Sequence, residues 1–132
     1  MKLRELNKLN CGYAKAAKPT LSFTVKSGLI RIGKEVCETL NVKEGDAIKF
    51  LQDEENPEDF FISKSTKDVG FVVRYNSSKS TFLVNAKKIT TILSELSDMK
   101  NKGVLNVVME PQVINKEKML LIITKPFKSK YL

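Results

Sequence analysis

The sequence contains no histidine and only two cysteines, Cys11 and Cys37. Without histidine, Ser-His-Asp and Cys-His catalytic arrangements within one chain are excluded. A zinc site of the Cys/His type within one chain is strongly disfavoured as well, because two cysteines cannot supply four ligands. Cys37 lies on the apolar face of a short predicted helix, so we expect it to be a small buried hydrophobic residue without a redox role.

Two kinds of binding or targeting sequence are also missing. There is no Gly-x-x-x-x-Gly-Lys-Ser/Thr phosphate loop and no Gly-x-Gly-x-x-Gly turn. No apolar run is long enough to span a bilayer, and residues 1–10 lack the apolar core of a signal peptide. We therefore expect a cytoplasmic protein that has no membrane partner, uses no cofactor or metal, and is not an enzyme.

Residues 53–59 form the one carboxylate cluster that could suggest a metal or acid–base site. It consists of Asp53, Glu54, Glu55, Glu58 and Asp59. The order of these residues does not match the Asp-x-Asp-x-Asp-Gly pattern of a calcium loop. Asn56 and Pro57 at its centre are typical turn residues, so the segment is interpreted as a solvated hairpin turn.

The formal net charge of +8 is unevenly distributed. Residues 1–19 carry five basic residues and one acidic residue, residues 20–66 carry six and nine, and residues 67–132 carry twelve and five. Positive charge is thus concentrated in the first and last of these segments. This asymmetry favours a polyanionic partner, usually nucleic acid.

The apolar pattern predicts the same order of elements twice, namely strand, strand, short helix, strand, strand. In the first repeat, residues 20–66, these elements lie at 21–26, 29–32, 34–40, 47–51 and 60–63; in the second, residues 67–132, they lie at 71–75, 81–84, about 86–96, 104–109 and 118–124, with a turn at 111–117. Such duplication indicates that each unit needs the other to bury its apolar face. The predicted fold is α+β and β-rich, with both repeats packed as one compact domain after a basic, flexible arm at 1–19.

Two stretches of the first repeat resemble a known family. Residues 27–36, SGLIRIGKEV, and 40–50, LNVKEGDAIKF, are similar to the two core motifs of the AbrB/SpoVT-like swapped-hairpin superfamily, with Gly33 at the position of the usual proline. The second repeat matches only in element order and apolar pattern, and MraZ-type members also carry two copies in one chain. The resemblance implies a pseudo-symmetric barrel of swapped-hairpin type, completed within one chain, whose strands and hairpin loops present basic residues to DNA.

The residues predicted to contact nucleic acid are basic positions on strand faces, turns and helix starts. They are Lys26, Arg31 and Lys34 in the first repeat and Arg74, Lys79, Lys87 and Lys88 in the second. Lys87 and Lys88 begin a predicted helix, where positive charge opposes the helix dipole, and this mild penalty favours a functional reason for them. Phe61 and Tyr75 could lie on outward strand faces and stack on unpaired bases.

Three functions remain open at this point. The first is a DNA-binding protein of swapped-hairpin type, a transcription regulator or antitoxin-like factor, for which duplex DNA is favoured and a homodimer is conceivable. The second is a single-stranded nucleic-acid binder of the whirly or Pur-alpha type, which also pairs strand-rich units that each carry one helix. The third is a protein-interaction or assembly module without a nucleic-acid role, which the acidic balance of residues 20–66 favours.

Overall fold

The computed structural model describes residues 19–124, so the predicted arm lies almost entirely outside the described residues. The elements in chain order are β1 (Thr20–Thr24), β2 (Leu29–Gly33), α1 (Lys34–Thr39), β3 (Ala47–Gln52), β4 (Asp59–Ser65), β5 (Phe71–Val72), β6 (Arg74–Asn76), β7 (Thr81–Asn85), α2 (Lys87–Ser97), β8 (Lys102–Ile114) and β9 (Glu117–Ile123). The prediction of a β-rich fold with two short helices is confirmed.

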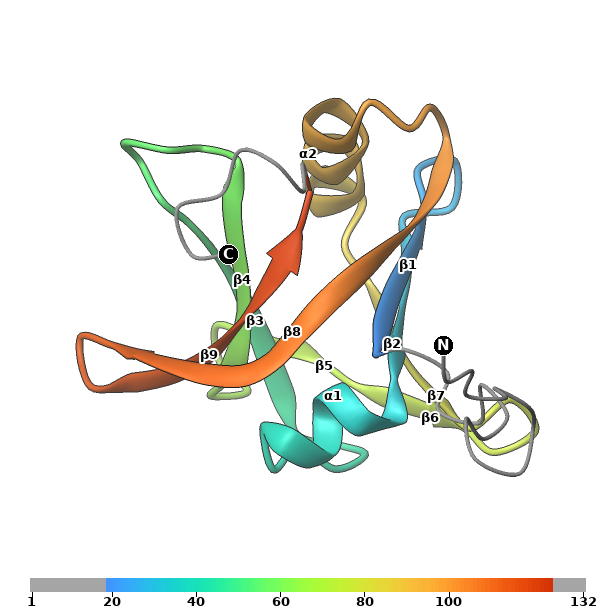
Figure 1. The fold of residues 1–132 in the computed structure, drawn as a ribbon. Coiled ribbons are helices and arrows are strands. Elements are labelled where there is room, and N and C mark those ends of the chain that lie inside the picture. Colours follow the sequence, from blue (N-terminus) through green and yellow to red (C-terminus); the bar gives the residue numbers. More distant parts are fainter. Residues whose placement is uncertain (1–18, 125–132) are drawn as a thin grey trace, which may run out of the picture.

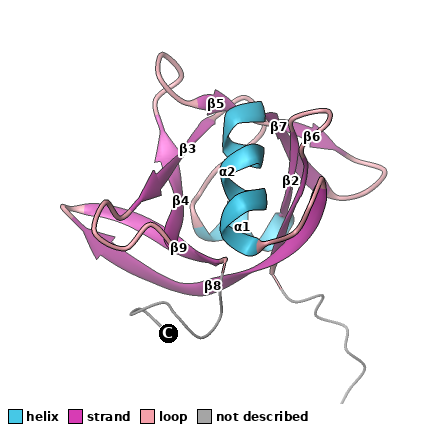
Figure 2. Cartoon of the chain, turned by 90° about the horizontal axis from the view of Figure 1, so that it is seen from above, coloured by secondary structure: helices cyan, strands magenta, loops and turns pink. Residues whose placement is uncertain are grey.

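The nine strands form one antiparallel sheet that curls into an almost closed barrel (Figure 1). Their order is β5-β3-β4-β9-β8-β1-β2-β7-β6. The two helices lie at opposite ends of the barrel, and Figure 2 shows α2 lying within the ring of strands when the molecule is seen from above. The interior is filled mainly by β-branched, leucine and phenylalanine side chains from both halves of the chain.

The first hairpin shows why alternating residues give this arrangement. Leu21 and Phe23 on β1 and Ile30 and Ile32 on β2 are buried in the barrel, while Arg31 between the two isoleucines is exposed. Successive strand residues point to opposite faces, so one hairpin supplies both core and surface. The predicted strand alternation is confirmed here.

The predicted strand at 71–75 is broken in the structure at Val73. The chain pairs with β3 through β5, passes through Val73, and then pairs with β7 through β6 at the other edge of the sheet. The Gly45 N–H donates to the Val73 carbonyl at 3.0 Å, and the Val73 N–H donates to the Asp46 carbonyl at 2.8 Å. These two bonds continue the pairing of β5 with β3, and the chain that passes through Val73 connects the two edges of the sheet, so the barrel nearly closes.

Each strand pairing in one half of the chain has a counterpart in the other. The pairing of β1 with β2 corresponds to that of β6 with β7, and β3 with β4 corresponds to β8 with β9. Likewise, the pairing of β1 with β8 corresponds to the pairing of β5 with β3. The remaining two pairings, β2 with β7 and β4 with β9, join equivalent strands of the two halves. Each first hairpin therefore lies beside strands of the other half.

The turn predicted at residues 111–117 is wrong, because β8 continues to Ile114. The reversal is made by Asn115 and Lys116, which have φ angles of 53° and 67°. Pairing with β9 is irregular between Val108 and Gln112, and Pro111 lies within this irregular stretch. Proline lacks an N–H and is tolerated in a sheet at such a bulge, so it does not end the strand here.

Helix α1 packs by its buried Val36 and Cys37 and ends at Thr39, and Asn41, just after the cap residue, reverses the chain in the left-handed region with φ 58°. The prediction of Cys37 as a buried hydrophobic residue is confirmed, since it is fully buried. Burial raises the pKa of its thiol to about 12, and the nearby Glu38 carboxylate adds to the shift. The thiol therefore stays protonated and weakly nucleophilic at neutral pH.

Replacement of Val73 by alanine tests how much side-chain packing at the junction between the two sheet edges contributes to stability. Val73→Ala removes two methyl groups that are 1% exposed, and we expect the free energy of unfolding to fall by about 1.5–3 kcal/mol. The matched control is Val69→Ala, because Val69 is 79% exposed. It should change stability by less than about 0.5 kcal/mol. Urea denaturation measures the free energy of unfolding of both variants. Equal losses would contradict a closely packed position for the Val73 side chain at the junction.

The turn before β3 should give the fold a defined acid sensitivity. The Lys43 N–H donates to Oδ2 of Asp46 at 3.0 Å, and this bond, with the charges of Lys64 and Lys67, holds the pKa of Asp46 below its ordinary value of 3.8. A lowered folded-state pKa contributes stability above the unfolded-state pKa, and this is lost as the pH falls through the folded-state pKa. The stability difference between wild type and Asp46→Asn should therefore shrink between neutral pH and about pH 3 in urea titrations.

Candidate nucleic-acid interface

One wall of the barrel is rich in positive charge. It consists of β6, β7, β2, β1 and the first part of β8 with their adjoining turns and α2 as far as Ser94, and we call it the basic wall (residues 19–34, 73–94 and 99–109). Acidic residues border it, since Glu95 and Asp98 follow in α2 and its cap and the Glu44 carboxylate accepts a hydrogen bond from the Tyr75 N–H on β6 at 3.1 Å. These ranges contain no aspartate or glutamate. They contain nine basic residues, all exposed, namely Lys26, Arg31, Lys34, Arg74, Lys79, Lys87, Lys88, Lys100 and Lys102.

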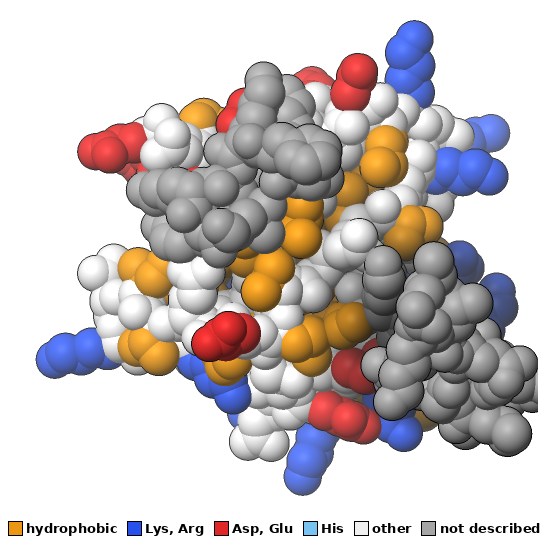
Figure 3. Space-filling view, viewed as in Figure 1, with side chains coloured by type: hydrophobic (Ala, Val, Ile, Leu, Met, Phe, Trp, Pro, Cys, Tyr) orange, Lys and Arg blue, Asp and Glu red, His pale blue; other side chains and the backbone are white. Residues whose placement is uncertain are grey.

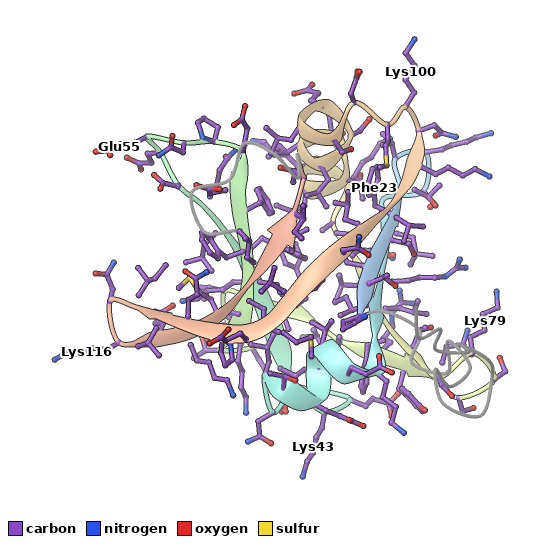
Figure 4. All side chains as sticks on the ribbon, in the orientation of Figure 1. Phe23, Lys43, Glu55, Lys79, Lys100 and Lys116 are labelled. Carbon is purple, nitrogen blue, oxygen red and sulfur yellow. The ribbon has the colours of Figure 1, made fainter. Side chains whose placement is uncertain are left out.

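The rest of the barrel has the opposite balance. Residues 35–69, which include α1, β3 and β4, carry ten acidic and four basic residues. Figure 3 shows a group of blue side chains projecting on the right, beside β1 and β2, and others at the lower left and the bottom, with red ones at the upper left, the top and the centre. Figure 4 places Glu55 at that upper left and Lys79 and Lys100 on the right. A polyanion would therefore be attracted to one side of the molecule.

Arg31 and Arg74, predicted from different repeats, are brought onto one row of the basic wall, which runs from β2 to the edge strand β6. Arg31 on β2 and Arg74 on β6 both pair with Leu83 on the intervening β7. Residues paired across neighbouring strands lie on the same face, so both guanidinium groups extend outward from one row. An Nη group of Arg74 donates to Oδ1 of Asn85 at 3.3 Å, which leaves the remaining donors of this exposed fork available for a ligand.

The β1–β2 turn brings a second group of cations beside the start of α2. The carbonyl of Gly28 accepts a hydrogen bond from the Ala86 N–H at 2.8 Å. The backbone of Gly28 approaches Lys87 so closely that a Cβ at this glycine would lie 2.9 Å from the Lys87 Cβ. Lys26 in the turn and Lys87 and Lys88 in the helix are thereby placed at the same end of the wall.

Lys100 and Lys102 extend this group but were not among the predicted residues. Lys102 begins β8 and pairs with Thr24 of β1, next to the turn that carries Lys26. The available sequence signal is the absence of acidic residues from 99 to 109 around both lysines. The predicted helix ends at about residue 96 and the next predicted strand begins at residue 104, so the sequence pattern does not place either lysine beside the first hairpin.

The other two predicted cations lie at the opposite end of β2. Lys34 starts α1 directly after β2, and Lys79 lies in the turn between β6 and β7. Lys34 lies 3.8 Å from Glu38, one helical turn further on, so its charge is partly compensated. Of the seven predicted residues, Lys34 is therefore expected to contribute least to anion binding.

The predicted aromatic platform is not available in the structure. Phe61 is 3% exposed, and Tyr75 is half-buried with its ring 4.9 Å from that of Phe82. Tyr75 packs against the core. Among the described residues of the basic wall, every aromatic side chain is buried or half-buried. Base stacking by these strands is therefore disfavoured, because it requires an exposed ring face.

The acidic segment 53–59 is a hairpin turn, as predicted, for most of its length. Oδ1 of Asp53 accepts hydrogen bonds from the N–H groups of Glu55 and Asn56 at 2.9 and 3.3 Å. Asp59 differs, because it begins β4 and is buried rather than solvated. Within residues 19–124 no group of three or more Cys, Asp or Glu side chains has an arrangement that could hold a metal ion.

Comparison with known proteins does not identify a family for this chain. No protein-family model, no curated protein and no solved structure matches the chain. Among residues 19–124, neither helix has the length and apolarity needed to cross a membrane.

Two glycines with positive φ angles test the contact between the β1–β2 turn and α2. Gly28 has φ 72° and Gly45 has φ 91°, so alanine at either position is strained by about 1–2 kcal/mol. Only at Gly28 would the added Cβ also collide with Lys87, since nothing lies within 4 Å of the Cβ position at Gly45.

We therefore expect Gly28→Ala to lower the free energy of unfolding more than Gly45→Ala in urea denaturation. The excess measures the cost of displacing the start of α2. Equal losses would show that this contact does not fix the position of Lys87.

Proposed function

We propose that the chain binds nucleic acid through the basic wall and that duplex DNA is its preferred ligand. The observation that carries the proposal is that nine exposed cations lie on one wall without an acidic residue in its three segments. Lysine and arginine that neutralise phosphates release condensed counterions, which supplies affinity for any nucleic acid. Arg31 and Arg74 offer the planar donor pairs that also recognise base edges.

The pairing of strands supports a duplicated swapped-hairpin unit. The β1–β2 hairpin lies between β7 and β8 of the other half, and the β6–β7 hairpin lies against β2. The two motif-like stretches correspond to the β2–α1 segment and to the turn that leads into β3. We infer that the two halves complete within one chain a barrel that two chains complete in single-copy relatives. A transcription regulator or antitoxin-like factor is the function that fits this inference.

The lack of an exposed aromatic ring on the described part of the wall favours duplex over single-stranded ligand. Non-specific binders of single strands combine a basic groove with aromatic rings on which bases stack. The described part of the basic wall offers the charge without the rings. A single-stranded binder remains the second candidate, and a protein-interaction module with an acidic face remains the third.

Fluorescence anisotropy with duplex and single-stranded oligonucleotides at two salt concentrations tests the proposal. We expect tighter binding to duplex, with an affinity that falls steeply as salt is raised. Preference for single strands would favour the second candidate. Absence of binding to either at low salt would contradict both and leave the protein-interaction module.

The double variant Arg31→Ala, Arg74→Ala locates the binding surface. Removal of two exposed arginines should weaken duplex binding at least about tenfold and reduce the salt slope by about 2 if both contact phosphates. The free energy of unfolding should change by less than about 1 kcal/mol, since both side chains are exposed.

The matched control is Lys67→Ala, Lys116→Ala, which removes the same charge from exposed positions outside the basic wall. It should leave affinity within about twofold, because charges on the far side act only through the screened field. If both double variants weaken binding equally, the attraction depends on net charge and the basic wall is not the interface.

A further inference from the structure

The outer face of the opposite wall carries a row of apolar side chains. Leu51 on β3 pairs with Phe61 on β4, which pairs with Leu121 on β9, which pairs with Val108 on β8. Phe61, Leu121 and Met119 are buried and form a cluster separate from the barrel core, and we call it the outer cluster.

The outer cluster faces away from the barrel interior. Phe60 and Ile62, the neighbours of Phe61 along β4, belong to the barrel core, and strand residues alternate between faces. Both helices pack elsewhere, α1 on β2, β7 and β8 and α2 on β1 and β2. The almost complete burial of Phe61 and Leu121 therefore requires a cover other than the described helices.

A groove of about 380 Å³ runs along the cluster between the end of the β8–β9 hairpin and the β3–β4 hairpin. Its lining includes Leu51, Phe61, Ile114 and Met119. The ion pair of Lys49 with Glu117, at 2.7 Å, joins β3 to β9 across this face. The groove is therefore open to an apolar occupant, with charged groups at its border.

Asp59 lies beside the groove, two residues before Phe61 on the same face of β4. Its side chain is 1% exposed, and neither carboxylate oxygen has a hydrogen-bond partner among residues 19–124. None of the ion pairs between described residues includes it. A buried, unpaired carboxylate is costly unless a cation lies against it. The site therefore calls for a segment with both a positive charge and apolar side chains.

The described part of the chain ends next to this carboxylate. Ile123 pairs with Asp59, and Oγ1 of Thr124 donates to the Glu58 carbonyl at 2.7 Å. The sequence that follows, KPFKSKYL at 125–132, contains three lysines together with Phe127, Tyr131 and Leu132. Eight extended residues reach about 26 Å, whereas the four residue steps from Asp59 to Ser63 span about 13 Å.

We propose that the outer groove is a docking site and that its occupant is the segment 125–132 of this same chain. One lysine of the segment pairs with Asp59, and its aromatic side chains cover the outer cluster. Charge complementarity, apolar content and the point at which the described chain ends all favour this occupant over a second copy or an unrelated peptide. The proposal is independent of the nucleic-acid function, because the groove lies on the wall opposite the basic wall.

A double-mutant cycle in the full 132-residue chain tests the ion pair. One variant is Asp59→Asn, and the other replaces Lys125, Lys128 and Lys130 by glutamine. Each change alone should lower the urea midpoint. The two together should cost less than their sum, because the second removes an interaction already lost. Strict additivity would overturn the assignment of a lysine to Asp59.

Phe127→Ala tests the apolar cover, with Val113→Ala as the control on the β8–β9 hairpin, where Val113 is 71% exposed. Phe127→Ala should lower the melting temperature by several degrees and increase binding of a dye that reports exposed apolar surface, and the control should do neither. No difference between the two variants would overturn the proposal. Stabilities that depend on protein concentration would also overturn it, since a second copy would then be the cover.

Discussion

The barrel nearly closes because the chain passes from one edge of the sheet to the other at a single residue, Val73. Val73 donates to the Asp46 carbonyl and accepts from the Gly45 N–H, and on either side of it the chain belongs to opposite edges of the sheet. An exposed sheet edge presents unpaired N–H and C=O groups that can pair with other chains. The passage through Val73 leaves two short strands, β5 and β6, at these edges. The turn at 43–46 therefore has a structural role well beyond connecting α1 to β3.

Closure of the sheet also separates the charges. Because β1 and β2 pair with β7 and β8, the acid-free segments of the two halves form one continuous wall. The acidic segment between β3 and β4 is carried to the other wall with β9. Within the first half the basic hairpin at 19–34 precedes the acidic residues 35–66, so the separation of charge begins in the sequence. The uneven charge of the barrel arises because each first hairpin lies beside strands of the other half.

Much of the local structure could be predicted, and the errors share a physical cause. Apolar alternation located the strands of the first hairpin, and helical spacing located α2 to within a residue at each end. The break at Val73 could not be foreseen, because a change of pairing partner leaves the alternation of side chains intact. Pro111 indicated a turn, although a bulge tolerates proline inside a strand. The seven predicted cations were found from local context, whereas Lys102 joins them only through its pairing with β1.

The spacing of the cations across neighbouring strands of the basic wall is informative about their role. Like charges directly opposite each other on neighbouring strands destabilise a sheet. Arg31 pairs with Ser22 and Leu83, Arg74 pairs with Leu83, and Lys102 pairs with Thr24, so these strand charges alternate with neutral residues. Between described residues of the wall, the one acidic partner at ion-pair distance is Glu38, which lies just outside it beside Lys34. A surface that spaces its positive charges and leaves most of them uncompensated is suited to an anion supplied from outside the chain.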